Sequence, residues 1–367
     1  MAEKVRNTVC IDCKSASICV TVRTRDLCEY RLRNAPKDRQ RKLLLPLSYG
    51  ISSMSLLHII SGLLGKQRST GQKRTAFDLH VLVVDPISSR PSKSPAESGR
   101  LDRIKEVYPG NTYTEIPLHR IFGYDTDIES VVSQYTTSPS ACESLESDEA
   151  TLNLFRASFS TSTARADIDT LLLRRLIVAF AKSHECDGIL WGDSDSRLAA
   201  KTLANVAKGR GSSLVWDVCD GLSPWGIYFN FPLRDLYKTE LELYASYVLS
   251  ALQPVIERDL QDFGNMTNRS MSIEDLMSQY VLTQGAKYPG VMANIVRTVD
   301  KLKTPQVESG KMCMLCETPV DALPEATADR EECNGPLDPG KRTIDQLTCY
   351  GCMRTLLDLK ALSLPLG

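Results

Sequence analysis

Four cysteines near the C-terminus have a spacing that suits metal chemistry. Cys313 and Cys316 form one C-x-x-C pair, and Cys349 and Cys352 form a second. Four thiolates are the tetrahedral ligand set that structural zinc prefers. The interval between the pairs is longer than the usual ~15–20 residues of a zinc ribbon, but its proline, glycine and acidic residues suit a loop. The pairs predict a structural zinc site. The alternative, four unconstrained free thiols, does not explain two equal pairs.

A second group of cysteines lies near the N-terminus, at Cys10, Cys13, Cys19 and Cys28. Cys10 and Cys13 form a clear C-x-x-C pair. The partner pair is incomplete, because the residue three positions after Cys28 is Arg31, so Cys19 would have to serve as a substitute ligand. A four-thiolate site that lacks one ligand loses much of its metal affinity. An N-terminal zinc site is therefore one possibility and an empty cysteine module is the other.

The segment "SYGISS", residues 48–53, has the position of a phosphate-binding loop between a strand and a helix. Backbone N–H groups at the N-terminus of a helix form an anion site. Ser48, Gly50, Ser52 and Ser53 are the candidate contacts, although the serines could equally serve only as helix caps.

Basic residues suggest two places for contact with RNA phosphates. The first is the run at 31–42, with Arg31, Arg33, Lys37, Arg39, Arg41 and Lys42. A solvated linker explains the same composition. The second is "KGRG", with Lys208 and Arg210, which is first of all a helix stop.

Composition limits the class of protein. The 367 residues carry a net charge of −1, so no global field attracts nucleic acid or an anionic membrane. The N-terminus has no apolar core that would suit a secretory signal. The longest apolar stretch, within 43–65, is interrupted by proline, glycine and serine, which favours a buried strand and helix over a membrane span. Twelve cysteines in a chain that we place in the cytosol argue for metal binding rather than disulfides.

The elements that must position these residues alternate between strands and helices. We expect strands at 43–47, 77–86, 112–122, 189–193 and 213–218, and helices at 54–64, 167–188, 196–211, 234–249, 272–284 and from 289 to about 303. Segments 87–100 and 133–166, rich in Ser, Thr and Pro, are expected to be loops. Strands separated by single helices predict an α/β fold with a doubly wound, mostly parallel sheet.

Four regions follow from this pattern. Residues 1–42 form a cysteine module and basic linker, 43–250 the α/β domain, 251–305 a helical extension, and 306–367 a zinc ribbon-like module. Small cysteine modules thus lie at both ends of the sheet domain.

Several segments together resemble one family. "LLLPLSYGISSMSLLHII" resembles the pyrophosphatase loop (PP-loop) of adenylating enzymes, whose working form is S-G-G-x-D-S. "ILWGDSDSRLAAKTLANVAKGRG" and "FPLRDLYKTELELYA" resemble two blocks of the tRNA-thiolating branch. The segment from "SIEDLMSQYVLTQ" to the closing "CMLC" and "CYGC" resembles the tail of the cytoplasmic tRNA 2-thiolation protein 2 family. The resemblance extends from Cys10 to Leu356 and implies a fold of the PP-loop type.

The chain departs from the active members of this branch in three places. Tyr49 replaces the first glycine of the loop and Ser52 replaces its aspartate, which removes a carboxylate that would associate with Mg²⁺. The paired acidic residues that follow the glycine of the second block are here Asp193 and Asp195, separated by a serine. No cysteine stands in "STARADID", before the central helix, where active relatives carry them. At the N-terminus, Cys28 runs directly into the basic run, where the family has a further segment.

The resemblance implies a required partner subunit in 2-thiolation of the wobble uridine of cytosolic tRNA for Lys, Glu and Gln, which yields 5-methoxycarbonylmethyl-2-thiouridine. The implied partners are a catalytic paralogue in a heterodimer, tRNA, and a thiocarboxylated ubiquitin-related modifier that supplies sulfur. A role in attaching that modifier to proteins is also allowed.

The lost loop residues lead us to expect no ATP turnover and no catalytic residue in this chain. Two alternatives stay open. The chain could be an active adenylating thiolase in which Asp193 or Asp195 holds Mg²⁺, or an unrelated zinc-ribbon scaffold that binds RNA.

Overall fold

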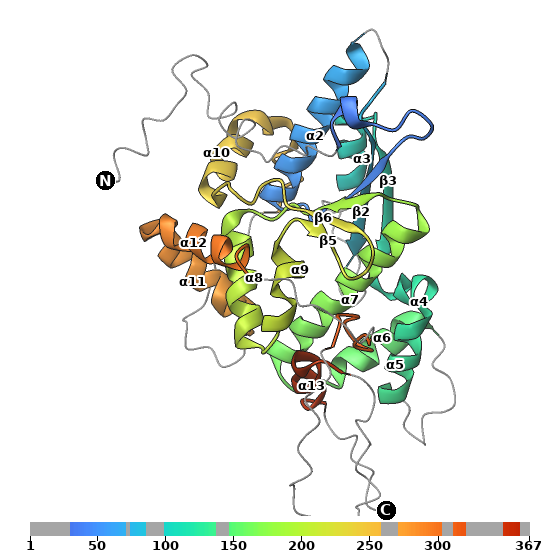
Figure 1. Cartoon of the computed structure of the whole chain (residues 1–367), viewed down its shortest axis with the longest axis vertical. Helices are drawn as coiled ribbons and strands as arrows, with labels where there is room; N and C mark the ends of the chain where they lie inside the picture. The colour runs from blue at the N-terminus through green and yellow to red at the C-terminus, as the bar shows by residue number, and fades with distance from the viewer. Residues whose placement is uncertain are drawn as a thin grey trace, which may run out of the picture.

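A computed structural model describes residues 30–70, 74–85, 99–136, 147–257, 271–302, 311–320 and 348–359. Its centre is a six-stranded sheet with the order β3-β2-β1-β4-β6-β5 (Figure 1). The strands are β1 (Lys42–Pro46), β2 (Asp78–Asp85), β3 (Thr112–Pro117), β4 (Gly188–Leu190), β5 (Gly221–Leu222) and β6 (Tyr228–Asn230). Every neighbouring pair is parallel except β5 and β6. The expected α/β class and mostly parallel sheet are confirmed.

The sheet reverses its direction of growth beside β1. From β1 the chain builds outward through β2 to β3 and then returns to place β4 on the other side of β1. In open α/β sheets, ligands bind at the carboxyl ends of the strands where the order reverses. The end of β1 is followed by residues 48–53, so the fold places that segment at the expected ligand position.

Helices cover both faces of the sheet. The face that packs on Leu43 and Leu45 of β1 is covered by α2 (Ile51–Ser69), α3 (Arg100–Val107) and α10 (Lys238–Val248). Leu44 points to the opposite layer. That layer holds α4 (Ile121–Tyr124), α5 (Thr126–Thr136), α6 (Asp148–Ala157), α7 (Ser162–Ser183), α8 (Asp195–Ala207), α9 (Leu214–Val218), α11 (Ile273–Lys287), α12 (Pro289–Val299) and α13 (Tyr350–Leu356).

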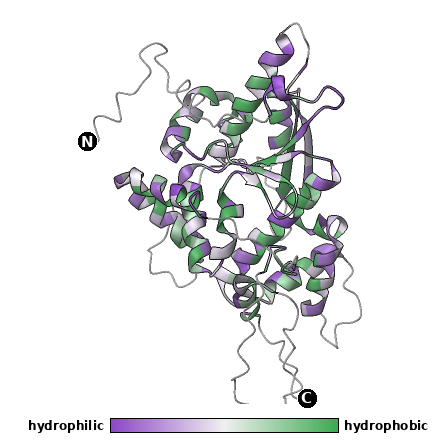
Figure 2. Ribbon diagram, viewed as in Figure 1, coloured by the Kyte–Doolittle hydropathy of each residue, from purple (hydrophilic) through white to green (hydrophobic). Residues whose placement is uncertain are grey.

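Burial on both sides explains the composition of the strands. A strand covered by helices on two faces has a nearly continuous apolar sequence, and in β1 all three central leucines are fully buried. Figure 2 shows apolar residues concentrated on the strands and on the helix faces that meet them. Short 3₁₀ turns at Leu32–Asn34, Leu118–Arg120, Gly211–Ser213 and Ser250–Leu252 complete the described elements.

Specific residues mark the ends of three helices that the sequence predicts. Ser272 caps α11 and accepts a hydrogen bond from the Asp275 backbone N–H at 3.1 Å. Pro289 occupies the first turn of α12, where its missing N–H has no cost. The glycine stop after α8 is also present: Gly209 has a φ of 79°, and the Arg210 N–H reaches back to the Asn205 carbonyl at 2.7 Å.

Three predictions of elements were wrong. Residues 213–218, expected to be a strand, are the last residue of the 3₁₀ turn Gly211–Ser213 and the whole of α9. So short an apolar run has no periodicity that separates strand from helix. The strand expected at 112–122 ends at Pro117. The segment 133–166, expected to be a loop, contains α6, whose cap Ser147 accepts from the Ala150 N–H at 3.3 Å, and the start of α7.

Within the described ranges, none of the helices combines the length and apolarity that crossing a bilayer requires.

Candidate metal centre and remnant nucleotide loop

The structure brings Cys313, Cys316, Cys349 and Cys352 together. Their sulfur atoms all lie within 4.8 Å of one another, and the Sγ atoms of Cys316 and Cys349 are 3.6 Å apart. A zinc tetrahedron with ~2.3 Å Zn–S bonds has edges of about 3.8 Å. Three of the four cysteines are buried and Cys349 is half-buried. The donor set and its spacing therefore fit a closed, four-coordinate metal site.

Local backbone structure places each pair of cysteines. In the first pair, the Glu317 N–H donates to the Cys313 carbonyl at 2.7 Å, and the turn is completed by a positive φ of 53° at Glu317. In the second pair, Cys349 caps α13, and its Sγ accepts from the Cys352 N–H at 3.4 Å. Tight turns that aim N–H groups at sulfur suit thiolate ligands, because hydrogen bonds stabilise the charged form.

The clustered thiols differ chemically from the isolated ones. Contact with Cys316 raises the pKa of Cys313 while contacts with Cys349 and Cys352 lower it, and the net result is about 7. Burial instead raises the pKa of Cys186 to about 11 and that of Cys219 to about 12. Thiolates are the metal-binding form. The net pKa shift is downward for Cys313, Cys316 and Cys349 and upward for Cys352, whose three sulfur neighbours and burial disfavour its thiolate. Cys186 and Cys219 are partly buried and pack against the core.

A buried arginine from α7 holds the first cysteine pair in place. Arg175 is 2% exposed. Its Nη1 donates to the backbone carbonyls of Met314 and Leu315 at 2.8 and 3.1 Å. Asp125 balances the charge through two contacts of 2.7 and 2.9 Å. Sequence reasoning missed Arg175, because a single arginine in an amphipathic helix carries no spacing signal.

Lys208 and Arg210, suggested as RNA contacts, lie inside the protein. They are 8% and 6% exposed and both form ion pairs with the buried carboxylate of Asp167. Burial alone would raise the pKa of Asp167, but the charges of Arg210 and Lys208 lower it to about 2. Both side chains make their contacts inside the protein and do not present their charge to solvent, which corrects the expectation that they form part of a phosphate-binding surface.

Of the candidate nucleotide-loop residues, Ser48 and Gly50 lie between β1 and α2, and Ser52 and Ser53 lie in the first turn of α2. Ser48 is exposed and Ser53 is buried, and their hydroxyl oxygens are 3.2 Å apart. The Ser53 hydroxyl also donates to the Gly50 carbonyl at 3.1 Å. Gly50 is the N-cap of α2 and Ser52 lies in its first turn. The two outer serines are thus already hydrogen-bonded within the loop.

Tyr49 adopts a backbone conformation that favours glycine. Its φ is 58°, in the left-handed region that costs a residue with a Cβ about 1–2 kcal/mol. The half-buried ring packs on the α2 layer, and the Arg100 guanidinium lies 5.6 Å from its centre. Burial raises the pKa of the Tyr49 hydroxyl. The tyrosine is therefore an anchored part of the core.

A distant segment of the same chain covers this loop. The Glu257 N–H donates to the Tyr49 carbonyl at 2.9 Å, and Glu257 forms a β-bridge with Gly50. The Glu257 carboxylate pairs with Arg100 at 2.6 Å. Because Arg100 neutralises this carboxylate, the segment acts on the loop through its backbone pairing with Tyr49 and Gly50.

Of the carboxylates that could have replaced the missing aspartate, Asp193 is held in an ion pair and Asp195 is buried. Asp193 pairs with Lys201 at 2.5 Å. Asp195 is 2% exposed and accepts from the Ser196 hydroxyl at 2.8 Å. Beside them, Gly192 packs so closely on α2 that an added Cβ would lie 2.7 Å from the Ser53 Cα. The end of β4 therefore packs directly against the loop.

The basic run divides between solvent and protein. Arg33, Lys37 and Arg39 are exposed, and Arg31, Arg41 and Lys42 are partly buried. Lys42 Nζ donates to the His184 carbonyl at 2.8 Å, Arg41 lies 5.6 Å from the centre of the Tyr30 ring, and Arg39 forms an ion pair with Asp187. Cys10, Cys13, Cys19 and Cys28 lie outside the described residues.

Sequence comparison links the chain to one family. The family model for cytoplasmic tRNA 2-thiolation protein 2 matches residues 272–336, which include α11, α12 and the first cysteine pair. A protein of that name from Coccidioides immitis is 66% identical, over 96% of this chain and 98% of its own length. One from Ajellomyces capsulatus is 52% identical, over 90% and 92%.

Structural comparison supports the fold. The U34-tRNA thiolase NcsA from Methanococcus maripaludis, solved with its [4Fe-4S] cluster, superposes with a TM-score of 0.51. The match covers 84% of this chain and 85% of that one at 13% sequence identity. At that identity the likeness concerns the arrangement of strands and helices, and it agrees with the expected PP-loop type of fold.

Proposed function

The chain belongs to the cytoplasmic tRNA 2-thiolation protein 2 family, and from this premise we propose that it is a non-catalytic partner subunit in that reaction. Membership places it in tRNA thiolation, and the family name assigns it to the cytoplasm. The proposed substrate position is the wobble uridine of tRNA for Lys, Glu and Gln, where the thiolated product is 5-methoxycarbonylmethyl-2-thiouridine.

The observation that carries the non-catalytic role is the state of the nucleotide loop. Tyr49 fills the position of a glycine, its carbonyl accepts the Glu257 N–H, and the Glu257 carboxylate lies beside the loop. An active loop instead keeps small residues at its turn and a carboxylate for Mg²⁺. Asp193 and Asp195 are held in other contacts. These contacts support a chain that does not turn over ATP.

A non-catalytic subunit needs a partner that performs the chemistry. We propose a heterodimer with a catalytic paralogue, which would receive sulfur from a thiocarboxylated ubiquitin-related modifier. The same complex could serve the attachment of that modifier to proteins. The preserved sheet supports this role, because a chain that keeps its fold and loses its loop chemistry can still offer a surface that matches the paralogue.

The cysteine cluster is proposed to hold zinc. Four thiolates in a closed, mostly buried set match structural zinc sites, which keep no open position for a substrate. Bound there, zinc would hold residues 313–317 to α13, and it would supply no reaction step. The N-terminal cysteines stay a prediction as a second zinc site.

Contact with tRNA is proposed for the exposed members of the basic run. Arg33, Lys37 and Arg39 lie on the surface just before β1. Charged side chains at the surface bind phosphates in a way that weakens with salt. Charge reversal at Arg33 and Lys37 should therefore weaken tRNA binding and reduce its salt dependence. Unchanged binding would remove this surface from the proposal.

The test of the non-catalytic role is ATP consumption by the purified chain. With Mg²⁺, ATP, a sulfur donor and unmodified tRNA, the chain alone is expected to form neither pyrophosphate nor thiolated tRNA. Addition of the catalytic partner to the same mixture should produce thiolation. Robust ATP-dependent thiolation by this chain alone would contradict the proposal.

A further inference from the structure

A buried guanidinium contacts the cysteine cluster from outside the metal-binding residues. Arg210, in the turn after α8, places its Nη1 3.2 Å from the Sγ of Cys352. The contact joins residues 142 positions apart in sequence. Both side chains are buried, so solvent does not screen the interaction.

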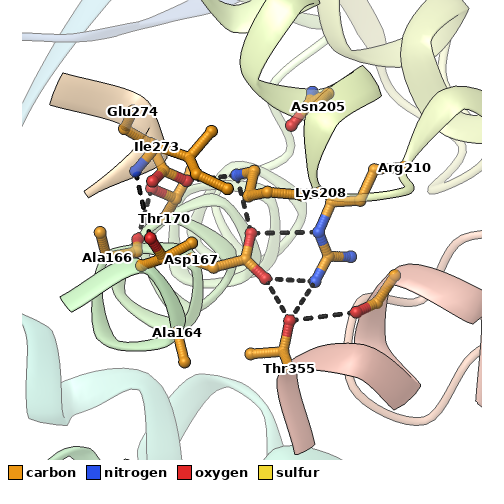
Figure 3. Close-up of polar contacts among 12 residues, drawn as sticks. Ala164, Ala166, Asp167, Thr170, Asn205, Lys208, Arg210, Ile273, Glu274 and Thr355 are labelled. Atoms are coloured by element: carbon orange, nitrogen blue, oxygen red, sulfur yellow. Dashed lines mark hydrogen bonds and ion pairs between the residues drawn. The ribbon is translucent and has the colours of Figure 1, made fainter. Parts of the chain in front are cut away.

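The orientation of Arg210 is fixed by one carboxylate. Asp167 of α7 accepts from Arg210 Nε at 3.0 Å and from Nη2 at 2.5 Å (Figure 3). The Thr355 hydroxyl of α13 lies 2.6 Å from the same carboxylate. A two-point contact holds the guanidinium plane, which leaves Nη1 directed at the sulfur.

Two glycines make this contact sterically possible. A Cβ on Gly351 would lie 2.5 Å from Cγ of Arg210, and a Cβ on Gly209 would lie 2.6 Å from the Tyr350 ring. The turn after α8 and the start of α13 therefore fit together only with glycine on each side. Such close packing indicates a built contact rather than a chance approach of a long side chain.

From this geometry we propose that Arg210 is a positioning residue for the metal proposed at Cys313, Cys316, Cys349 and Cys352. Four thiolates around a divalent ion leave a net charge of about −2, and the Arg210 guanidinium offsets part of it through the hydrogen bond to Cys352. Hydrogen-bonding partners outside the ligand set commonly change metal affinity about 10–100-fold. The inference rests on the proposed metal site.

Lys208 supplies a matched control. Its Nζ contacts Asp167 at 2.8 Å and forms an ion pair with Glu274 of α11 (Figure 3). It therefore belongs to the same buried network, but its described polar contacts are with carboxylates and not with sulfur. Lys208→Met disturbs the network about as much as Arg210→Met does, while the Arg210–Cys352 contact stays in place.

The experiment measures release of zinc from the purified full chain to a chromogenic chelator. Arg210→Met should release zinc at least about tenfold faster than the parent, and Asp167→Asn should also accelerate release because it frees the guanidinium. Lys208→Met should stay within about twofold. Arg210→Lys keeps the charge without the two-point contact, and its rate of zinc release should lie between those of the parent and Arg210→Met. This variant keeps the test usable if Arg210→Met fails to fold.

Two results would overturn the inference in distinguishable ways. In the first result, the parent chain carries zinc, and either Arg210→Met releases it as slowly as the parent or Lys208→Met releases it as fast as Arg210→Met. This result removes the role of Arg210 and keeps the metal site. In the second result, the parent chain holds no zinc even when zinc is supplied during purification. This result removes the metal site as well. Substitution of Co²⁺ gives a second readout: its thiolate absorption bands should shift in Arg210→Met and not in Lys208→Met.

Discussion

At the scale of single residues, Tyr49 carries the clearest conflict between side chain and backbone. Its φ of 58° favours glycine, but its ring packs in the core beside Arg100. Loss of the ring should cost less than the ~1.5–3 kcal/mol of a fully buried apolar side chain, because the ring is half-buried. Removal of the left-handed strain should return about 1–2 kcal/mol. Packing and strain are therefore of similar size at this position.

A pair of variants separates the two effects. Tyr49→Gly should change the free energy of unfolding by no more than about 1 kcal/mol, whereas Tyr49→Ala loses the same ring and keeps the strain. Urea denaturation should therefore find Tyr49→Ala less stable than Tyr49→Gly. The reverse order would mean that the loop relaxes and that the positive φ is not required.

His80 of β2 provides the pH dependence at this scale. Its ring is buried, with Nε2 2.9 Å from the Thr114 hydroxyl and with Phe180 and His184 against it. Burial, with help from the charges of His184 and Lys42, lowers the pKa of His80 from 6.5 to about 4. The unfolded chain thus binds a proton more readily than the folded one between these values.

The contribution of His80 to the free energy of unfolding should therefore be fully present above about pH 6.5. It should be lost progressively as the pH falls towards 4. One such group contributes a slope of at most about 1.4 kcal/mol per pH unit. His80→Gln keeps a hydrogen-bonding side chain that cannot charge in this range. Denaturation between pH 5 and 8 should show a shallower slope for the variant, and an unchanged slope would assign the acid sensitivity to other groups.

At the scale of elements, the junction of β4 with α2 depends on one glycine. A Cβ on Gly192 would meet backbone at 2.7 Å, whereas Gly62, on the exposed side of α2, has no atom within 4 Å of its Cβ position. Gly192→Ala should destabilise the chain by about 1–3 kcal/mol. Gly62→Ala should stabilise it by up to about 1 kcal/mol. Thermal unfolding of both variants tests the packing, and equal effects would contradict it.

The sequence predicts most elements whose apolar pattern is long. β1, β2, α7, α8, α11 and α12 lie where periodicity places them, and the cysteine pairs and residues 48–53 lie in the expected local contexts. Residues 213–218 were assigned wrongly and β5 and β6 were missed, because runs this short take their conformation from neighbours.

The missing parts of the site share a different cause. Arg175, Arg210 and Glu257 reach the cysteines or the loop from positions far away in the chain. Their pairing depends on how helices pack, which no spacing within one segment encodes. The same limit explains why Lys208 and Arg210 were mistaken for surface charges: a basic turn has the same sequence whether it faces solvent or a buried carboxylate.

At the scale of the whole molecule, the chain combines a PP-loop type of fold with a loop that backbone pairing ties to a distant segment. The segment that reaches Glu257 lies over the loop on one side of the sheet, and the cysteine cluster joins α7 to α13 on the other. Both sets of contacts hold separate parts of the chain together. This arrangement suits a subunit whose contribution is shape and binding rather than a reaction step.

The most direct test measures 2-thiouridine at the wobble position by mass spectrometry of tRNA from cells that lack this gene. The cells are complemented with the parent chain or with Gly50→Val, whose added Cβ would meet only the Ser48 hydroxyl, at 3.5 Å, yet would obstruct a pyrophosphate. The account predicts that deletion abolishes the thiolated nucleoside and that both chains restore it. Unchanged thiolation after deletion, or failure of a Gly50→Val chain that accumulates to the parental level, would contradict it.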